Sequence, residues 1–259
     1  MDLFVANRGQ PDQLYRHNAD GTFSDVAPDV GIDYPQNEFP ANSEGVAWGD
    51  YDNDGDADLF LANLSRTNPL YRNDGDGTFI EVTRDSGIIL DRKSIGASWA
   101  DLDIFVANFA TTPNWLFHSN GTDNNFLVVK PVGTISNRNA IGAKVTAVAT
   151  IGGEEVTQAR EITTASSRHA QDSLSADFGL GEATSMDITL KFPSGIVVEL
   201  KQVEPNQTFE ILEAAPSLPN TGGIVPPWQT LLMVSAVFFI AGVLLLVFWT
   251  ISNPRSVRP

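Results

Sequence analysis

Two stretches of this chain align with each other without a gap at a constant offset of 56 residues. Residues 2–32 read DLFVANRGQPDQLYRHNADGTFSDVAPDVGI, and residues 58–88 read DLFLANLSRTNPLYRNDGDGTFIEVTRDSGI. A third copy starts with GASWADLDIFVANF at residues 96–109. Such self-similarity constrains the fold strongly, because it means that one structural unit recurs along the chain.

Each repeat has the pattern of short strands divided by turns. In the second repeat, apolar and β-branched runs predict strands at residues 45–51, 59–63, 69–72 and 78–83. Four-stranded units at this period suggest blades of a β-propeller type. The connection at residues 89–98 is expected to be a surface loop. The segment NDGDG at residues 73–77 has two explanations, a second metal site or a hairpin turn, and its Asn-Asp-Gly composition favours the turn.

The segment GDYDNDGDADLF, residues 49–60, places five aspartates on alternate positions: Asp50, Asp52, Asp54, Asp56 and Asp58. Carboxylates this close repel each other unless a positive charge lies between them. A hard cation with oxygen ligands fits this spacing, which predicts Ca²⁺. The first six positions match an EF-hand loop, but position twelve is Leu61 and the flanks suit strands rather than helices. The loop is therefore expected to join two strands, and the third repeat, which is six residues shorter here, has lost it.

The second repeat, from GVAWGDYDNDGDADLFLAN to NPLYRNDGDGTFIEVT, resembles an FG-GAP/VCBS-type repeat, whose loop pattern is D-x-[DN]-x-[DN]-G-x-x-D. The resemblance implies a calcium-binding blade of the kind found in secreted and surface proteins. It also implies side-chain ligands from Asp50, Asp52, Asp54 and Asp58, and a backbone carbonyl ligand from Asp56. Gly55 permits the sharp bend that the loop needs.

The following region resembles an ASPIC/UnbV domain. The landmarks are NRNAIGAKV at residues 137–145, FGLG at 178–181, FPSG at 192–195 and PNQT at 205–208. In the cartilage acidic protein-like group, this module follows FG-GAP/VCBS repeats. The residues themselves support a β-sandwich, because short, often alternating apolar runs are divided by Gly and Pro.

Composition excludes several kinds of function. The chain has 259 residues with a formal net charge of −16, which argues against nucleic acid as a partner. The absence of Cys excludes disulfides and thiolate metal sites. There is no Gly-rich phosphate loop and no HExxH motif, and the local grouping around His169 (SSRHAQDS) is not that of a catalytic triad.

We therefore expect a non-enzymatic, calcium-binding surface protein whose β repeats mediate adhesion or bind a protein or glycan ligand. The alternative is the C-terminal binding or anchoring part of a larger surface enzyme that acts on polysaccharide or lipid. The second reading requires a catalytic domain upstream. Asp2 aligns with Asp58, so the first repeat starts inside a blade and we expect an N-terminally incomplete sequence.

The C-terminal end has the pattern of a membrane anchor. Residues 231–251 contain no charged side chain and, at about 1.5 Å per residue, would span roughly 30 Å as a helix. Trp228 and Trp249 lie near its ends, and Arg255 and Arg258 follow it. This arrangement predicts a cytoplasmic C-terminus and β domains outside the cell. A buried core helix is the alternative explanation.

These features predict an all-β fold with partial β-propeller-type repeats, a β-sandwich and one C-terminal transmembrane helix. The expected organisation is about two and a half repeats at residues 1–122, an ASPIC/UnbV-like domain at 123–213, a Pro/Gly linker at 214–227, the transmembrane helix at 228–251 and a basic cytoplasmic tail at 252–259.

The linker contains a pattern typical of a processing signal. Its residues Leu218, Pro219, Asn220, Thr221 and Gly222 resemble the L-P-x-T-G sorting signal of Gram-positive surface proteins, in which a sortase cleaves between Thr and Gly. The order of pentapeptide, apolar segment and basic tail matches that signal. The alternative is a flexible linker before a permanent membrane anchor.

Mass spectrometry of the mature C-terminus distinguishes these two explanations. Sorting predicts a chain that ends at Thr221 and carries a cell-wall peptide on its carboxyl group. A mature species that extends to Pro259 would exclude sorting and leave the membrane anchor.

Overall fold

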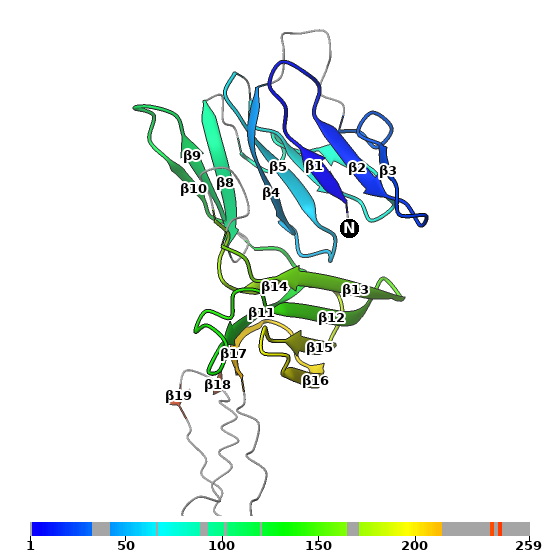
Figure 1. Ribbon diagram of the computed structural model, residues 1–259, viewed down its shortest axis with the longest axis vertical. Coiled ribbons are helices and arrows are strands. Elements are labelled where there is room, and N and C mark those ends of the chain that lie inside the picture. Colours follow the sequence, from blue (N-terminus) through cyan, green and yellow to red (C-terminus); the bar gives the residue numbers. More distant parts are fainter. Residues whose placement is uncertain are drawn as a thin grey trace, which may run out of the picture. The chain divides into compact units, whose positions relative to one another are not determined.

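The computed structural model describes residues 2–32, 42–65, 67–88, 93–100, 103–119, 121–164 and 171–213, together with residues 239–240 and 243–244. All the elements assigned in these ranges are strands, so the all-β prediction is confirmed for them. The chain divides into two compact units, Met1–Pro216 and Ser217–Pro259. Figure 1 shows the order of the strands along the chain.

The three repeats each form an antiparallel sheet. The first contains β1 (Leu3–Val5), β2 (Gln13–His17) and β3 (Phe23–Asp25). The second contains β4 (Ser43–Gly49), β5 (Asp58–Asn63), β6 (Leu70–Asn73) and β7 (Phe79–Glu81). The third contains β8 (Ser94–Ala100), β9 (Asp103–Asn108) and β10 (Trp115–Phe117). Within the described residues, these sheets do not close into a propeller.

The four strands predicted for the second repeat are confirmed, with ends that differ by one or two residues. The prediction of a loop at residues 89–98 is wrong from Ser94 onward, because β8 starts there and pairs with β9. The shortening of the third repeat affects only the tip of the hairpin. Ala100 pairs with Asp103, whereas Gly49 pairs with Asp58 across the whole acidic loop.

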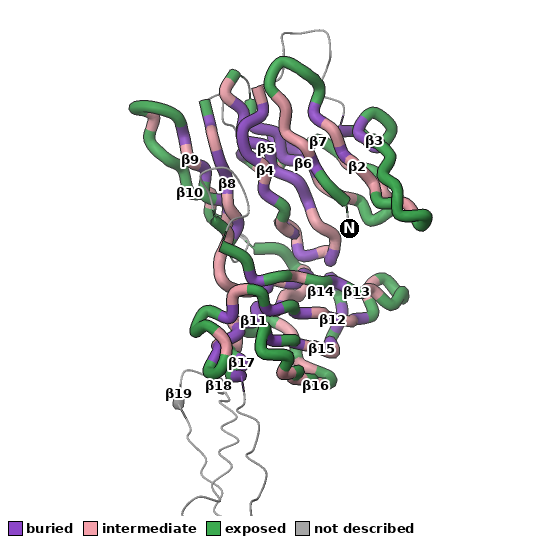
Figure 2. The backbone as a smooth tube through the Cα atoms, in the orientation of Figure 1, coloured by how far each residue is buried: buried purple, intermediate pink, exposed green. Residues whose placement is uncertain are grey.

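The second repeat is buried on both faces. Every residue of β5 is buried, and Figure 2 shows burial continuing from β5 into its neighbours β4 and β6. Leu59 and Leu61 pack with residues of the first repeat, and Phe60 packs with residues of the third. Alternate side chains of one strand thus enter two cores, because successive residues of a strand point to opposite faces.

Buried polar pairs also connect neighbouring repeats. The Ser43 hydroxyl donates to Asp12 at 2.6 Å, and the Asn68 amide donates to Ser94 at 2.9 Å. Asp12 and Asn68 occupy equivalent positions at the offset of 56. The same carboxylate and amide each accept a backbone N–H from their own repeat, from Asn7 and Asn63 respectively. Each pair therefore fixes one repeat against the next.

The C-terminal part of the first unit consists of two sheets around one core, as predicted for a β-sandwich. One sheet has the order β14-β11-β17 and the other β13-β12-β15-β16. The strands are β11 (Asn125–Val132), β12 (Lys144–Ile151), β13 (Glu154–Glu161), β14 (Ala176–Gly181), β15 (Met186–Lys191), β16 (Val197–Val203) and β17 (Gln207–Leu212). Alternate residues of β12 and β15 face the core, among them Val145, Ala147, Ile188 and Leu190.

Glu213 follows the end of β17 and forms hydrogen bonds to two turns of the sandwich. Its buried carboxylate accepts backbone N–H groups from residues 134, 135 and 136 and hydroxyl protons from Ser136 and Ser194. Burial by itself opposes ionisation of this group, but the hydrogen bonds from Ser194 and Ser136 outweigh it and lower the pKa of Glu213 to about 2. The carboxylate therefore joins β17 to two turns of the domain.

The predicted transmembrane segment at residues 228–251 lies almost wholly outside the described residues. Four residues within it are described, as the paired strands β18 (Phe239–Ile240) and β19 (Val243–Leu244). Among the described residues, no helix is long and apolar enough to cross a membrane. The predicted sorting signal at residues 218–222 and the basic tail also lie outside the described ranges.

Replacing Glu213 with Gln should make the sandwich less stable at neutral pH and less sensitive to acid. A carboxyl whose folded pKa is depressed contributes stability above its unfolded pKa near 4.5, and this contribution is lost as the pH falls toward 2. Urea unfolding measured between pH 2 and pH 7 should therefore show a shallower pH dependence for Glu213→Gln than for the wild type. Glu210→Gln is the matched control, because Glu210 is an exposed residue of the same strand. Equal pH dependence in both variants would contradict this role for Glu213.

Candidate metal centre

The acidic loop connects β4 to β5 and has a folded backbone of its own. Asn53 and Gly55 adopt positive φ angles of 58° and 104°, which turn the chain back on itself. The Asp50 carboxylate accepts N–H groups from Asp54 at 3.1 Å and from Gly55 at 3.0 Å. The predicted strand–loop–strand arrangement is thus confirmed, and Gly55 is located at the bend as expected.

Three of the five aspartates converge. Asp50, Asp52 and Asp58 each place one carboxylate oxygen within 4.8 Å of the others. Two oxygens bound to one Ca²⁺ at about 2.4 Å can be at most about 4.8 Å apart, so this set is compatible with a single ion. The Oδ1 atom of Asp52 is buried and has no hydrogen-bond partner. Burial of such an oxygen costs free energy unless it is hydrogen-bonded or paired with a positive charge, and a bound cation would supply that charge.

The other two aspartates are arranged differently. Asp54 is not among the three converging residues, and its carboxylate accepts the Asp56 N–H at 2.9 Å. The side chain of Asp56 approaches the hairpin at Gly75, where an added Cβ would be 2.5 Å from Asp56 Oδ2. The roles of Asp54 as a side-chain ligand and of Asp56 as a carbonyl ligand remain predictions.

Electrostatics in the loop disfavour several negative charges at once. Burial, followed by the charges of Asp54 and Asp52, raises the pKa of Asp50 to about 7, although a hydrogen bond from Gly55 opposes this. Burial raises the pKa of Asp58 to about 9 against hydrogen bonds from Asn73 and Tyr51. The pKa values of Asp52, Asp54 and Asp56 are raised as well, with burial as the first cause. A divalent cation would stabilise the ionised forms of these groups.

Asp58 also has a structural task that recurs in each repeat. Its Oδ1 accepts the Asn73 N–H at 2.9 Å and its Oδ2 accepts the Tyr51 N–H at 2.8 Å. The equivalent residues Asp2 and Asp103 likewise accept backbone N–H groups, from His17 at 3.1 Å and from Ser119 at 3.0 Å. Asp103 belongs to the repeat without an acidic loop, so this hydrogen bond does not depend on a metal site.

The hairpin at residues 73–77 has the geometry of a turn. Gly75 and Gly77 have positive φ angles of 74° and 89°, and Asp76 accepts both the N–H and the hydroxyl of Thr78. Asp20 makes the same two bonds with Thr22 in the first repeat. Asp76 is therefore used within the turn, which supports the turn over a second metal site.

The structure adds residues that the sequence pattern gave no reason to associate with the loop. Asn124 donates to the Asp52 carbonyl at 2.9 Å, and the Gly181 N–H donates to the Asn53 carbonyl at 2.8 Å. The Arg160 guanidinium interacts electrostatically with Asp50 and Asp177, and burial lowers its pKa. These residues lie 70 or more positions away in the sequence, and no repeat or short motif links them to the loop.

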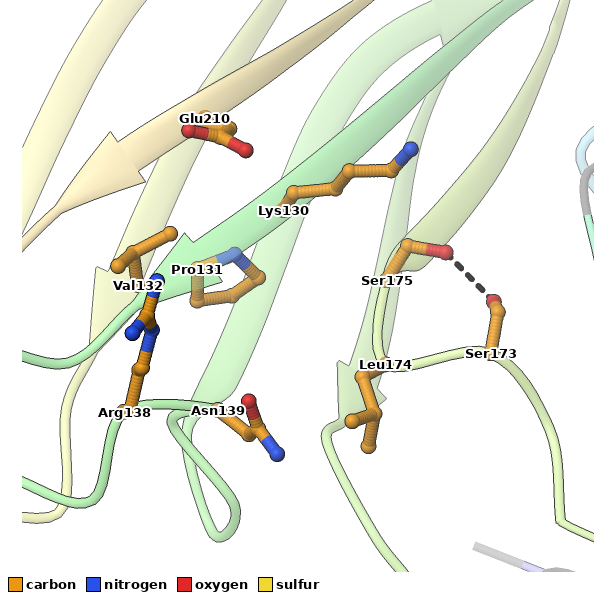
Figure 3. Close-up of a pocket in the computed structure, with 9 residues that line it drawn as sticks. All are labelled: Lys130, Pro131, Val132, Arg138, Asn139, Ser173, Leu174, Ser175 and Glu210. Atoms are coloured by element: carbon orange, nitrogen blue, oxygen red, sulfur yellow. Dashed lines mark hydrogen bonds between the residues drawn. The ribbon is translucent and has the colours of Figure 1, made fainter.

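A second feature is a pocket of about 340 Å³ on the sandwich, shown in Figure 3. It is lined by Lys130, Arg138, Glu210 and the hydroxyl groups of Ser173 and Ser175, which hydrogen-bond to each other at 2.5 Å. Two cationic side chains and one carboxylate leave a small positive charge at this pocket in a strongly acidic chain. Such a lining suits a small hydroxylated or anionic ligand.

Comparison with known proteins agrees with the arrangement of these parts. Residues 1–61 and 50–103 match the FG-GAP-like repeat, and residues 133–217 match ASPIC and UnbV. The chain carries FG-GAP-like repeats and an ASPIC/UnbV domain. The two modules suggest a repeat-containing extracellular protein.

The chain is also similar to "Cartilage acidic protein 1" over a stretch of 70 residues. Identity is 34% with the protein of Homo sapiens, 33% with that of Mus musculus and 31% with that of Xenopus tropicalis. Each match covers 27% of this chain and 10% of the relative, so the matched region spans about a tenth of the relatives' length.

Substitutions at Asp58 and Asp52 should separate structural from ligand roles when calcium is removed by a chelator. Asp58→Asn replaces one acceptor oxygen by an amide that faces a backbone N–H, and it should lower the free energy of unfolding by about 1–3 kcal/mol. Asp52→Asn removes a charge that its neighbours disfavour, so no loss is expected. Chemical denaturation in chelator measures both. Equal destabilisation by the two changes would contradict this division of roles.

Proposed function

We propose that this chain is the calcium-binding part of an extracellular or cell-surface protein and that it is not itself an enzyme. The observation that carries the proposal is the convergence of carboxylate oxygens from Asp50, Asp52 and Asp58 around the buried, unpartnered Oδ1 of Asp52. Carboxylate and carbonyl oxygens are the donors that Ca²⁺ prefers. The FG-GAP-like match over this loop supports the same ion.

In this proposal the ion has a structural role. The loop supplies several oxygen donors from one short segment, which leaves few coordination positions for a substrate. Binding to the folded state alone stabilises that state by mass action. Calcium would thus hold β4 and β5 in register at the end of the hairpin where the carboxylates repel each other.

We propose that the outer face of the third repeat binds a protein ligand. Phe60 and Leu70 face each other across the β5–β6 pair and are fully buried towards the third repeat. Phe105 and Leu116 form the equivalent pair of the third repeat, yet their exposed fractions are 41% and 63%. Exposed apolar patches mark interaction sites. A glycan ligand would instead suit the polar pocket near Lys130.

We also propose that the C-terminal end attaches the chain to the cell surface. The uncharged segment at residues 231–251 would anchor the chain in the membrane, and LPNTG at residues 218–222 would allow a sortase to transfer it to the cell wall. Both arrangements leave the repeats and the sandwich outside the cell.

Isothermal titration calorimetry tests the calcium site. The wild-type chain should bind one Ca²⁺ with a dissociation constant on the order of 10⁻⁴–10⁻³ M, the range of extracellular modules. The double change Asp52→Ala and Asp54→Ala should abolish this binding. Glu81→Ala with Asp85→Ala removes the same charge from exposed positions of the same repeat outside the loop and should leave binding intact. Calcium uptake that survives the loop substitutions would refute the assignment.

A further inference from the structure

The acidic loop of the second repeat lies directly against the C-terminal sandwich. Gly179 has no room for a side chain, since an added Cβ would be 1.9 Å from Asp50 Oδ2 and 2.6 Å from Asn53 Cα. On the loop side, a Cβ on Gly55 would be 2.8 Å from Ile151 Cδ1. Glycines on both sides thus let two backbones approach closely, as close backbone contacts require.

The hydrogen bonds across this contact depend on the shape of the loop. The sandwich donates from Gly181 N–H to the Asn53 carbonyl at 2.8 Å and from the Asn124 amide to the Asp52 carbonyl at 2.9 Å. Both acceptors are main-chain carbonyls at the bend of the loop. These carbonyls can accept the two hydrogen bonds only while the loop keeps the backbone conformation in which Asn53 and Gly55 have positive φ angles.

Charge reinforces the contact on the sandwich side. A cavity of about 120 Å³ lies at the contact and is lined by Asp50, Asn53, Arg160, Asp177 and others. Arg160 interacts electrostatically with both carboxylates and donates to Gln158 Oε1 at 3.3 Å, and Gln158 in turn donates to the Gly179 carbonyl at 2.6 Å. One cation cannot balance several ionised carboxylates in the loop, and a bound divalent ion would add the positive charge that keeps them ionised.

We propose that calcium at the acidic loop locks the sandwich onto the repeats, so that the loop is a cation-dependent joint between the two modules. This inference rests on the proposed calcium site. Without the ion, repulsion loosens the loop and moves the two carbonyls away from Asn124 and Gly181. With the ion, the loop has the shape that the sandwich binds. Coupling of this kind is reciprocal, so docking of the sandwich also strengthens calcium binding.

Removal of calcium would loosen the joint without separating the two modules, because a second contact between them does not involve the loop. The Trp99 N–H of the third repeat donates to Asp172 at 2.9 Å, and the Ser173 N–H donates to the Trp99 carbonyl at 3.2 Å. These bonds keep the modules together when calcium is absent. The ion therefore changes the order of β13 and β14 more than it changes the association of the modules.

Hydrogen–deuterium exchange of the full-length chain, with calcium and with chelator, tests the joint alongside calorimetry. In the wild type, calcium should slow exchange in peptides from β13 and β14, which contain none of the proposed ligands. Asn124→Ala removes one bond to the loop but no ligand, and it should raise the calcium dissociation constant by up to about tenfold. Asn139→Ala, an exposed position on the same domain, should change neither readout.

The possible outcomes distinguish failure of the proposed joint from failure of the proposed calcium site. Normal calcium binding with protection confined to the repeats would overturn the joint, and so would an Asn124→Ala chain that binds calcium as tightly as the wild type. If the wild-type chain shows no heat of calcium binding, the site itself fails and the joint fails with it. Circular dichroism of Asn124→Ala, expected to match the wild type, confirms that the variant is folded.

Discussion

Each repeat of this chain is a small sheet with two apolar faces, and one sheet alone cannot remove both faces from water. The second repeat solves this by lying between the other two, with Leu59 and Leu61 in one core and Phe60 in the next. Burial of apolar surface is the main favourable term in folding, so this stacking carries the stability of the repeats. The polar pairs Ser43–Asp12 and Asn68–Ser94 then fix how neighbouring sheets align.

This packing gives the acidic loop a rigid base. β4 and β5 are held from both sides, and residues 50–58, which run from the end of β4 to the first residue of β5, contain five carboxylates. These carboxylates have different roles. Asp58 accepts backbone N–H groups, as its counterparts do in the other repeats, whereas Asp52 has a buried oxygen without a hydrogen-bond partner. Repulsion and burial would oppose this arrangement, and a calcium ion would stabilise it.

Much of this architecture could be predicted from local sequence patterns. Strand alternation located the sheets of the second repeat to within two residues, and the Asn-Asp-Gly composition identified the turn at residues 73–77. The prediction of a surface loop at residues 89–98 missed the start of β8 at Ser94. The six residues that the third repeat lacks shorten only the hairpin tip, since strand pairing on either side keeps its register.

Contacts between distant segments could not be predicted in this way. Arg160, Asn124 and Gly179 reach the loop through the relative placement of two modules, which no period or short motif encodes. The FGLG motif indicated a domain type, but it did not indicate that its glycines let the acidic loop pack closely against the sandwich. Glu213 was recognised only as a domain end, although its five hydrogen bonds make it the closing point of the sandwich.

The most direct test of the calcium site is a crystal structure of the chain grown with Ca²⁺, with the ion located by its anomalous scattering. We expect one strong peak at the acidic loop, with oxygens of Asp50, Asp52 and Asp58 at about 2.3–2.6 Å from it. No peak at the loop in crystals grown at millimolar calcium, with the Asp52 oxygen still buried and without a partner, would contradict it.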